Sequence, residues 1–201
     1  MIGIINYRAG NLQNLQNSLS FIGEESRIIN SPSEMDGNTK FILPGVGAFG
    51  HAVKNLHEYG FWEPLKEAVS ANIPMLGICV GMQVLFSKSF EDGIHEGLNL
   101  IKGEVKKFET DLKVPQMGWN TVNFNNSKDP LLSGIDDQSW FYFVHSFACH
   151  PDDNNLMLGS TNYDYDFCSI VNQNNLWGVQ FHPEKSQNPG LKLLKNFCEI
   201  C

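Results

Sequence analysis

The sequence predicts an α/β fold, with an open and mostly parallel sheet, flanking helices and added antiparallel strands. In residues 1–90, short apolar runs alternate with segments of helical spacing, which is typical of parallel β-α-β units. In the second half, short β-rich segments are separated by Asn, Asp and Gly turns, which is typical of antiparallel strands. No repeat or flexible linker divides the chain, so we expect residues 1–201 to form a single domain.

The first half begins with an apolar run that we expect to be a buried strand. Leucines then recur at helical spacing until Gly23, a residue type that commonly ends helices. The dipeptide Pro44-Gly45 breaks the third apolar run, and Gly60 interrupts a longer helical segment. These signals predict strands at residues 1–6, 27–30, 41–43 and 74–78, and helices at residues 11–22, 48–71 and 82–88.

The second half predicts mainly strands. Its segments are short, rich in β-branched and aromatic side chains, and bounded by turn residues. Helical spacing returns only near the end, through Leu191, Leu194 and Phe197. We therefore expect strands at residues 104–108, 121–124, 140–144, 156–161, 168–171 and 176–180, and a last helix at residues 191–200.

Composition and charge narrow the possible classes of function. The formal net charge of -8 and the absence of a Lys/Arg-rich run argue against nucleic acid as a partner. No apolar stretch approaches the roughly 20 residues that a membrane-spanning helix needs, so we expect no membrane segment. The first residues lack the pattern of a secretory signal. Five irregularly spaced cysteines do not suggest a disulfide framework, so we expect a cytoplasmic protein.

The most informative segment is the Gly-x-Cys-x-Gly turn at residues 77–81, where a predicted strand leads through Cys79 into a predicted helix. This arrangement is the cysteine form of a nucleophile elbow. Gly77 and Gly81 would avoid side chains that collide in a sharp, strained turn, and a helix N-terminus would favour the thiolate form of Cys79. The N–H of Val80 would then be one oxyanion donor. A small buried core cysteine is the alternative interpretation.

A second candidate segment is the tripeptide His182-Pro183-Glu184, which follows a predicted strand. In an extended chain, residues i and i+2 lie on the same side, so His182 and Glu184 can face together while Pro183 stiffens the link. A histidine base oriented by a carboxylate would complete a catalytic triad with Cys79. The strand ends of an open α/β sheet gather at one edge, where the parts could meet. A surface turn is the alternative interpretation.

A glycine-rich loop at residues 44–50 follows the third predicted strand. Glycines let backbone N–H groups approach a ligand, so this loop could supply a second oxyanion donor, or it could be an ordinary tight turn. It lacks the Gly-Lys-Ser/Thr of a phosphate-binding loop. The histidines show no metal-binding spacing, and Cys198 and Cys201 form a single pair, whereas a closed zinc site needs four ligands. We therefore expect neither a metal nor another cofactor.

Five motifs occur in order along the chain: PGVGAFG, GICVGMQVLF, VPQMGWN, YFVHSF and GVQFHPEKS. They resemble the motifs of the class I (triad) glutamine amidotransferases. Three of them also resemble, more narrowly, the glutaminase subunits of imidazole glycerol phosphate synthase in histidine biosynthesis: PGVGAFG, MGWN and HPEKS. The resemblance covers nearly the whole chain, and it departs from the usual residues at Asn6-Tyr7-Arg8, Gln116 and Phe147.

The resemblance implies an enzyme that hydrolyses the side-chain amide of glutamine, and it assigns roles to single residues. Cys79 would attack the amide, His182 would transfer protons and Glu184 would orient the histidine ring. The other roles that it implies are oxyanion backbone positions at Gly47 and Val80, glutamine-binding positions at Gln83, Glu91, Ser146 and Phe147, and partner-contact positions at Trp119, Asn120 and Lys185.

The resemblance also implies a heterodimer. Ammonia would pass to a cyclase subunit with a (β/α)8 barrel, which makes imidazole glycerol phosphate and aminoimidazole carboxamide ribotide. This chain would then be a hydrolase that acts as part of a synthase complex with lyase activity. A paralogous glutaminase that supplies another synthase, such as one modifying a surface sugar, is the alternative. Gln83 and Glu91 disfavour a cysteine peptidase of the same elbow fold, and the intact triad disfavours a binding module without catalysis.

Overall fold

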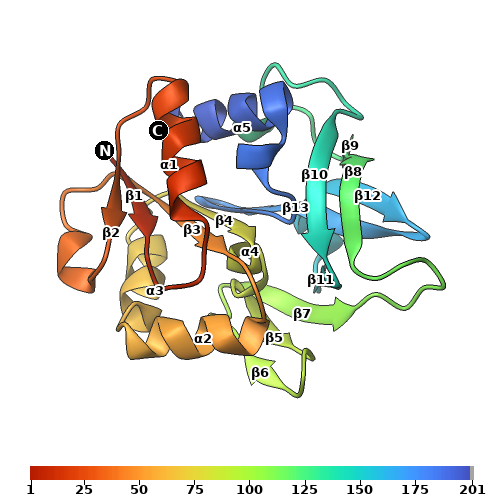
Figure 1. The fold of residues 1–201 in the computed structure, drawn as a ribbon, viewed down its shortest axis with the longest axis horizontal. Helices are drawn as coiled ribbons and strands as arrows, with labels where there is room; N and C mark the ends of the chain where they lie inside the picture. The colour runs from red at the N-terminus through yellow and green to blue at the C-terminus, as the bar shows by residue number, and fades with distance from the viewer. Residues whose placement is uncertain (200–201) are drawn as a thin grey trace.

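A mixed sheet of twelve strands runs through residues 1–199, the part of the chain that the computed structural model describes. Its parallel block contains β1 (Ile2–Ile5), β2 (Ser26–Ile29), β3 (Lys40–Gly45), β4 (Met75–Cys79) and β14 (Leu176–Val179), in the order β2-β1-β3-β4-β14. On one side of this block lie α1 (Leu12–Phe21) and α5 (Gln187–Glu199), and on the other lie α2 (Phe49–Glu58) and α3 (Trp62–Ser70) (Figure 1).

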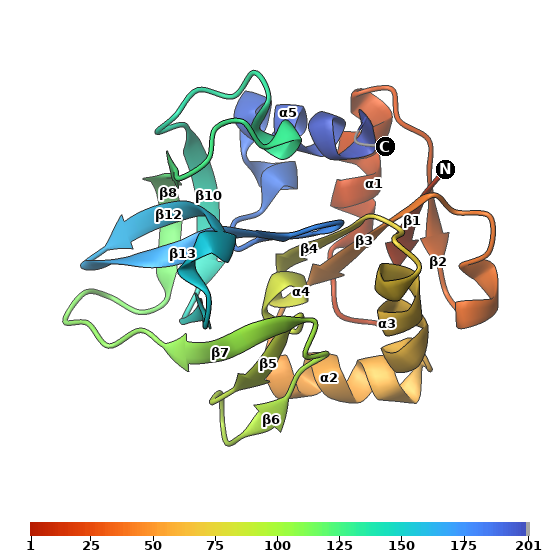
Figure 2. The ribbon, with the colours of Figure 1, turned by 180° about the vertical axis from the view of Figure 1, so that it is seen from behind.

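The second half of the chain extends the sheet, mostly with antiparallel pairs (Figure 2). Beyond β14 the order continues through β13 (Tyr165–Gln173), β11 (Phe147–Pro151), β7 (Ile101–Lys107), β5 (Phe86–Ser89) and β6 (His95–Glu96), while β12 (Met157–Tyr163) pairs with β13 and with β9 (Asn123–Phe124). A separate antiparallel ribbon consists of β8 (Gln116–Thr121) and β10 (Trp140–His145). Single 3-10 turns are η1 (Pro32–Glu34), η2 (Pro130–Leu132), η3 (Asn154–Leu156) and η4 (Pro183–Lys185).

Helix α1 shows how the local sequence sets the ends of an element. The Asn11 side chain caps its N-terminus by accepting a hydrogen bond from the Asn14 N–H at 3.3 Å. Leu15 and Leu19 are its buried residues. Gly23 follows the helix with φ of 85°, a conformation that glycine adopts without strain. Apolar spacing therefore selects the face that packs, and polar or glycine residues set the ends.

Helix α5 ends against a buried lysine of the parallel block. Lys40, in β3, donates from Nζ to the carbonyl oxygen of Phe197 at 3.2 Å and to that of Cys198. The helix has no basic residue in its own last turn. Lys40 supplies the positive charge that a helix C-terminus favours, and it ties α5 to the sheet.

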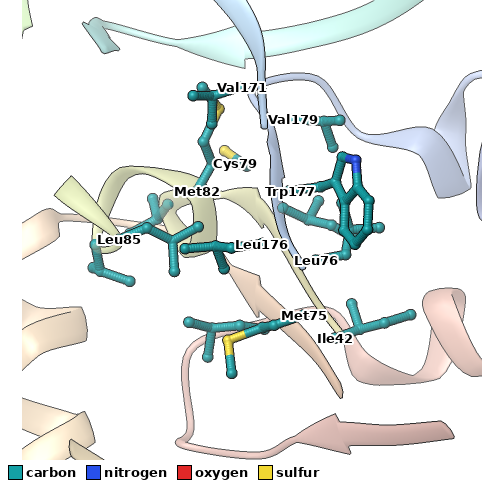
Figure 3. Close-up of a cluster of buried hydrophobic side chains, with 14 of the residues drawn as sticks. Ile42, Met75, Leu76, Cys79, Met82, Leu85, Val171, Leu176, Trp177 and Val179 are labelled. Atoms are coloured by element: carbon teal, nitrogen blue, oxygen red, sulfur yellow. The ribbon is translucent and has the colours of Figure 1, made fainter. Parts of the chain in front are cut away.

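The parallel block is buried on both faces. Every residue of β1, β3, β4 and β14 is buried, as expected for parallel strands covered by helices on each side. Figure 3 shows part of this core, where Met75 and Leu76 of β4 are drawn with Leu176 and Trp177 of β14. Each large apolar side chain buried in such a core stabilises the fold by about 1.5–3 kcal/mol. The ends of these strands are therefore firmly held.

The structure confirms the predicted α/β class and most of the predicted elements. The four parallel strands of the first half lie where the sequence predicts them, and Gly60, with φ of 75°, separates α2 from α3. The predicted strand at residues 121–124 is divided between β8 and β9. Residue 200 of the last predicted helix and Cys201 lie outside the described residues. Among those described, no helix is long and apolar enough to cross a membrane.

The predicted break at Pro44-Gly45 is wrong. β3 continues through both residues and pairs with β4, with Pro44 opposite Ile78. Pairing between β3 and β1 ends at Ile42, so Pro44 lies where β3 has a single neighbouring strand. A proline is tolerated at such a position, because its missing N–H interrupts no ladder on the open side.

The helix predicted at residues 82–88 is wrong beyond its first turn. Helix α4 spans only Val80–Gln83, and Phe86–Ser89 forms β5, which pairs in parallel with β7. Phe86 is fully buried, and sheet pairing outweighs the helical spacing. The strands β5, β6 and β11, and all of β8 before Thr121, were not predicted, because they are short and rich in residues of low strand preference.

The packing at Gly81 provides a test of the fold. A Cβ on Gly81 would collide with the carbonyl oxygen of Leu43 and lie 2.8 Å from its carbon, so β3 and α4 would have to separate. We expect Gly81→Ala to lower the free energy of unfolding by more than about 3 kcal/mol. The control Gly23→Ala meets nothing within 4 Å, and its backbone strain should cost roughly 1 kcal/mol. Urea denaturation measures both values, and equal losses would contradict the packing argument.

Candidate active site

Strand β4 ends at Cys79, whose backbone turns sharply, with φ of 56° and ψ of -115°, before α4 begins. A positive φ is strained for a cysteine. The adjacent glycines make the turn possible, because a Cβ on Gly77 would lie 2.6 Å from the carbonyl oxygen of Gly81 and a Cβ on Gly81 would collide with Leu43. The backbone therefore has the strained elbow that the motif predicts.

Strand register brings the second candidate segment beside Cys79. β14 lies parallel to β4 with Val179 opposite Ile78, so the residues after both strands leave the sheet at the same edge. His182 lines the same cavity as Cys79, the interaction with Cys79 contributes to its raised pKa, and its Nδ1 lies 2.8 Å from Oε1 of Glu184. Only 4% of the histidine side chain and 5% of the glutamate side chain are exposed. The structure thus joins the three predicted triad residues in a buried chain of contacts.

The link between His182 and Glu184 is not the extended chain that we expected. Residues Pro183–Lys185 form the 3-10 turn η4, and Pro183 occupies its first position, where the fixed φ of proline is favourable. Ser186 fastens the turn by donating to the carbonyl oxygen of His182 at 2.6 Å. The turn, rather than the alternation of a strand, therefore folds Glu184 back toward the imidazole ring.

His182 sets the charge of the site. Burial lowers its pKa, but hydrogen bonds and charge interactions with Cys79 and Glu184 more than offset burial and raise the pKa to about 10. His182 is therefore protonated at neutral pH, and the sulfur of Cys79 faces an imidazolium. The longer helix that we expected behind Cys79 is absent, since α4 is a single turn. The imidazolium, not a long helix dipole, is the main positive charge beside the sulfur.

A cavity of about 280 Å³ opens beside Cys79 and His182. Its walls come from the loop after β3, the elbow, the segment after β5 and the turn between β10 and β11. Glu184 does not line it, because this residue lies behind the ring of His182. The other predicted oxyanion and glutamine-binding residues all line the cavity: Gly47, Val80, Gln83, Glu91, Ser146 and Phe147.

Two polar side chains of the cavity are fixed by hydrogen bonds to the fold. Glu91 accepts through Oε2 from the N–H of Phe49, at the start of α2, at 2.6 Å, which leaves Oε1 for a ligand. Gln83 donates from Nε2 to the carbonyl oxygen of Phe147 at 3.3 Å and to Oε1 of Gln180 at 3.1 Å. The cavity therefore offers a carboxylate oxygen and an amide oxygen, which suit a small molecule with ammonium or amide N–H groups.

The arrangement fits nucleophilic attack on a carbonyl group. A sulfur lies beside an imidazolium, a carboxylate orients the ring, and Val80 is the first residue of α4, where backbone N–H groups have no partner within the helix. These are the parts that thiol-based acyl transfer requires.

Comparison with known proteins identifies the family. Residues 4–201 match the family model described as glutamine amidotransferase class-I. The chain belongs to the class I glutamine amidotransferases. Imidazole glycerol phosphate synthase subunit HisH of Sulfurimonas denitrificans is 47% identical to this amidotransferase, over 98% of this chain and 97% of its own. Imidazole glycerol phosphate synthase subunit HisH 1 of Campylobacter jejuni is 45% identical over 100% of both chains.

The fold of this amidotransferase also occurs in a distant solved structure. PurLQS from Thermotoga maritima matches with a TM-score of 0.79 over 98% of this chain and 96% of that chain, at 17% identity. At so low an identity the match shows the shared fold alone. It agrees with the predicted class of an open sheet with flanking helices.

The amidotransferase carries an exposed apolar face on the ribbon of β8 and β10. Met117, Trp119 and Trp140 are 65%, 43% and 57% exposed, and Trp119 lies opposite Tyr142 in the register of the ribbon. The ammonium group of Lys185 lies 5.8 Å from the centroid of the Tyr142 ring. Two of the three predicted partner-contact residues, Trp119 and Lys185, therefore meet around one tyrosine.

The third predicted partner-contact residue, Asn120, is not brought to this face. Its Nδ2 donates to the carbonyl oxygen of Asn162 in β12 at 2.8 Å, and its Oδ1 accepts from the N–H of Thr121 at 2.8 Å. Successive residues of a strand face opposite sides, so Asn120 lies on the side of β8 that faces away from the exposed tryptophan. Its contact with a partner stays a prediction.

Two buried polar residues at the site, His145 and Gln180, were not predicted from the sequence. His145 directly follows the strand predicted at residues 140–144, and its ring lies 2.7 Å from the carbonyl oxygen of Phe147 and 2.9 Å from Oε1 of Gln116. The Nε2 of Gln180 lies 3.8 Å from Sγ of Cys79. Gln180 is the last residue of the strand predicted at residues 176–180, which leads to His182, and this position was the available signal, because strand ends in α/β sheets supply site residues.

His145 provides a pH-dependent test of the site. Burial lowers its pKa from 6.5 to about 4. The unfolded chain therefore binds a proton between about pH 6.5 and pH 4 that the folded chain does not, and the free energy of unfolding falls as the pH drops through this window. The full window corresponds to roughly 3 kcal/mol. We expect His145→Gln to flatten the profile in urea denaturation, relative to the wild type.

The matched control is His51→Gln, which changes an exposed histidine of α2 and should leave the pH profile of the wild type unchanged. Carboxylate titration is common to all three proteins and cancels in the comparison. Parallel profiles for the wild type and His145→Gln would contradict the assignment.

Proposed function

We propose that this chain is the glutaminase subunit of imidazole glycerol phosphate synthase, and that it hydrolyses glutamine to glutamate and ammonia. The observation that carries the proposal is the cavity in which Cys79 and His182 meet Gln83 and Glu91, because it joins a thiol nucleophile to groups suited to an amino acid. Relatives that carry this subunit's name over their full length support the choice within the family, and they give no support to a paralogue that modifies sugars.

In the proposed reaction, the thiolate of Cys79 attacks the carboxamide carbon of glutamine. Backbone N–H groups of Gly47 and Val80 stabilise the negative oxygen of the tetrahedral intermediate. The imidazolium of His182 protonates the leaving nitrogen, the C–N bond breaks, and ammonia departs from a glutamyl thioester. A water molecule then attacks the thioester while neutral His182 takes its proton. Glutamate leaves and Cys79 returns to the thiolate, with Glu184 orienting the ring throughout.

The polar groups of the cavity support glutamine as the substrate. The free Oε1 of Glu91 is placed to accept from the α-ammonium group, because its other oxygen is held by α2. Gln83 contributes an amide oxygen as a second acceptor. The backbone of Ser146 and Phe147 also lines the cavity and would hold the α-carboxylate end.

We propose that the exposed face of the ribbon binds the cyclase subunit, a (β/α)8 barrel, to form a cytoplasmic heterodimer. Aromatic, methionine and cationic side chains of the kind found here are enriched at the centres of interfaces. The same strand β10 carries Tyr142 toward this face and ends in Val144 and His145, which line the cavity. Ammonia would therefore have a short path into the partner. The whole chain, residues 1–201, would act as one glutamine amidotransferase domain.

Selective labelling tests the proposed nucleophile. We expect a chloroketone analogue of glutamine to label Cys79, because it faces the imidazolium and lines the cavity. Burial raises the pKa of Cys149, and it raises that of Cys168 to about 12, so these thiols should not react. Cys79→Ser should lose both labelling and glutaminase activity while it melts at an unchanged temperature, and Cys198→Ser is the matched control that keeps both. Peptide mass spectrometry locates the label, and equal labelling of Cys149 would disprove the assignment.

Activation by the partner tests the proposed complex. Val46 and Gly47 are exposed, and Gly47 has φ of 91°. Glycines permit a second backbone arrangement at modest cost, so the second oxyanion N–H need not face the cavity in the isolated chain. One missing oxyanion donor costs roughly 10²–10³-fold in rate. We expect slow glutamine hydrolysis by the isolated chain and an increase of about this factor when a histidine-pathway cyclase with a nucleotide analogue is added.

The variant Trp119→Ala should weaken this activation by raising the concentration of cyclase that is needed. Phe21→Ala is the matched control, since Phe21 is 78% exposed and belongs to α1, which Figure 1 shows apart from the ribbon. Glutamate release measures both. High activity of the isolated chain would refute latency, and activation by a sugar-modifying synthase alone would replace the proposed partner.

A further inference from the structure

Gln180 is fully buried directly after β14, and the reaction proposed above gives it no role. The pairing of β14 with β4 reaches Val179 and Ile78, which puts Gln180 and Cys79 one step further along the same register. Its Nε2 donates toward Sγ of Cys79 at 3.8 Å, and its Oε1 accepts from Nε2 of Gln83 at 3.1 Å. One buried amide therefore joins the sulfur to a polar group of the cavity wall.

The side-chain oxygen of Gln180 fixes the orientation of Gln83, as the hydrogen bonds of Gln83 show. A glutamine side chain has two N–H donors and one carbonyl acceptor. The amide nitrogen of Gln83 donates to the carbonyl oxygen of Phe147 and to Oε1 of Gln180. The reversed amide would set its oxygen against two acceptors, so Gln83 is held in one orientation. Its oxygen is then left for the cavity that it lines, where it accepts from an N–H group of a ligand.

The side-chain nitrogen of Gln180 acts on the sulfur of Cys79. A buried thiolate is costly without hydrogen-bond donors or positive charge. His182 supplies one such contact to Cys79, but its proton leaves when the leaving nitrogen is protonated. The side-chain amide of Gln180, whose Nε2 lies 3.8 Å from the sulfur, is a donor that does not ionise and so keeps its protons in the proposed reaction. It therefore favours the sulfur anion both before attack and when the thioester is broken.

We infer that Gln180 is a positioning residue, which stabilises the reactive form of Cys79 and fixes the acceptor orientation of Gln83. This inference rests on the proposed glutaminase function. If Gln180 only filled space, neither its side-chain oxygen nor its side-chain nitrogen would be needed. An apolar side chain of the same volume would fill the buried space without the cost of desolvating an amide.

Two variants of Gln180 separate its effect on Cys79 from its effect on Gln83. Gln180→Met is similar in length and removes both hydrogen bonds. Gln180→Glu keeps an acceptor for Gln83 but places a carboxyl group, which disfavours a neighbouring anion, beside the sulfur. Both variants are compared with the wild type on the isolated chain by two measurements. The first is the pH profile of Cys79 alkylation with iodoacetamide. The second is the half-protecting glutamine concentration, at which the rate of Cys79 alkylation falls to half.

We expect Gln180→Met to move the midpoint of the alkylation profile upward by about one pH unit and to raise the half-protecting glutamine concentration about tenfold. Gln180→Glu should raise the midpoint at least as far and leave the half-protecting concentration within about twofold of the wild type. Gln173→Met, which changes a half-buried glutamine at the far end of β13, is the matched control and should move neither value.

Each outcome decides one point. If the wild type shows no preferential alkylation of Cys79 and no protection by glutamine, the proposed function fails. If the wild type shows both and neither Gln180 variant moves the midpoint, the inference about Gln180 is overturned while the proposed function stands. Thermal melting identifies a variant that does not fold. If Gln180→Met does not fold, the test rests on Gln180→Glu, and an unchanged alkylation midpoint in Gln180→Glu overturns the inference.

Discussion

The candidate active site depends on the parallel register between β4 and β14. These strands lie about one hundred residues apart in the sequence, and no local contact joins them. The register sets Val179 opposite Ile78, so the next residues of both strands leave the sheet side by side. A shift by one residue would turn the following side chains to the opposite face and separate Cys79 from Gln180. The chemistry proposed for the cavity thus follows from backbone hydrogen bonds between two buried strands.

The strained turn at Cys79 persists because the parallel block around it is rigid. A residue held in an unfavourable backbone region costs about 1–3 kcal/mol and survives only where its surroundings determine it fully. All residues of β3 and β4 are buried, and Gly81 packs directly on the backbone of Leu43. The same close packing explains why β3 runs on through Pro44 instead of breaking there: its last residues support the elbow from the neighbouring strand.

The parts of the site that the sequence predicts are those encoded locally. The Gly-x-Cys-x-Gly turn and the His182-Glu184 pair depend on residues within a few positions of one another, and the structure brings Cys79 and His182 to the same cavity, with Glu184 behind the histidine ring. The β5 strand was not predictable, because its pairing with β7 is a contact between separate segments and outweighs the helical spacing of residues 82–88. The roles of Gln180 and His145 were not predicted for the same reason, because the residues that they contact, Cys79 and Gln116, are distant from them in the sequence.

The two halves of the chain contribute different physical properties to the cavity. The rigid parallel block holds the sulfur and the imidazole, while the end of β10 and the β10–β11 turn supply another part of the cavity wall. A continuous series of polar contacts connects them, from the buried amide of β8 through the turn to the sulfur: Gln116 to His145, His145 to the Phe147 carbonyl, Phe147 to Gln83, Gln83 to Gln180, and Gln180 to Cys79. The ribbon that begins this series is also the one with an exposed aromatic face. A protein that binds that face therefore contacts the strands whose inner side orients the cavity wall, without touching the triad itself.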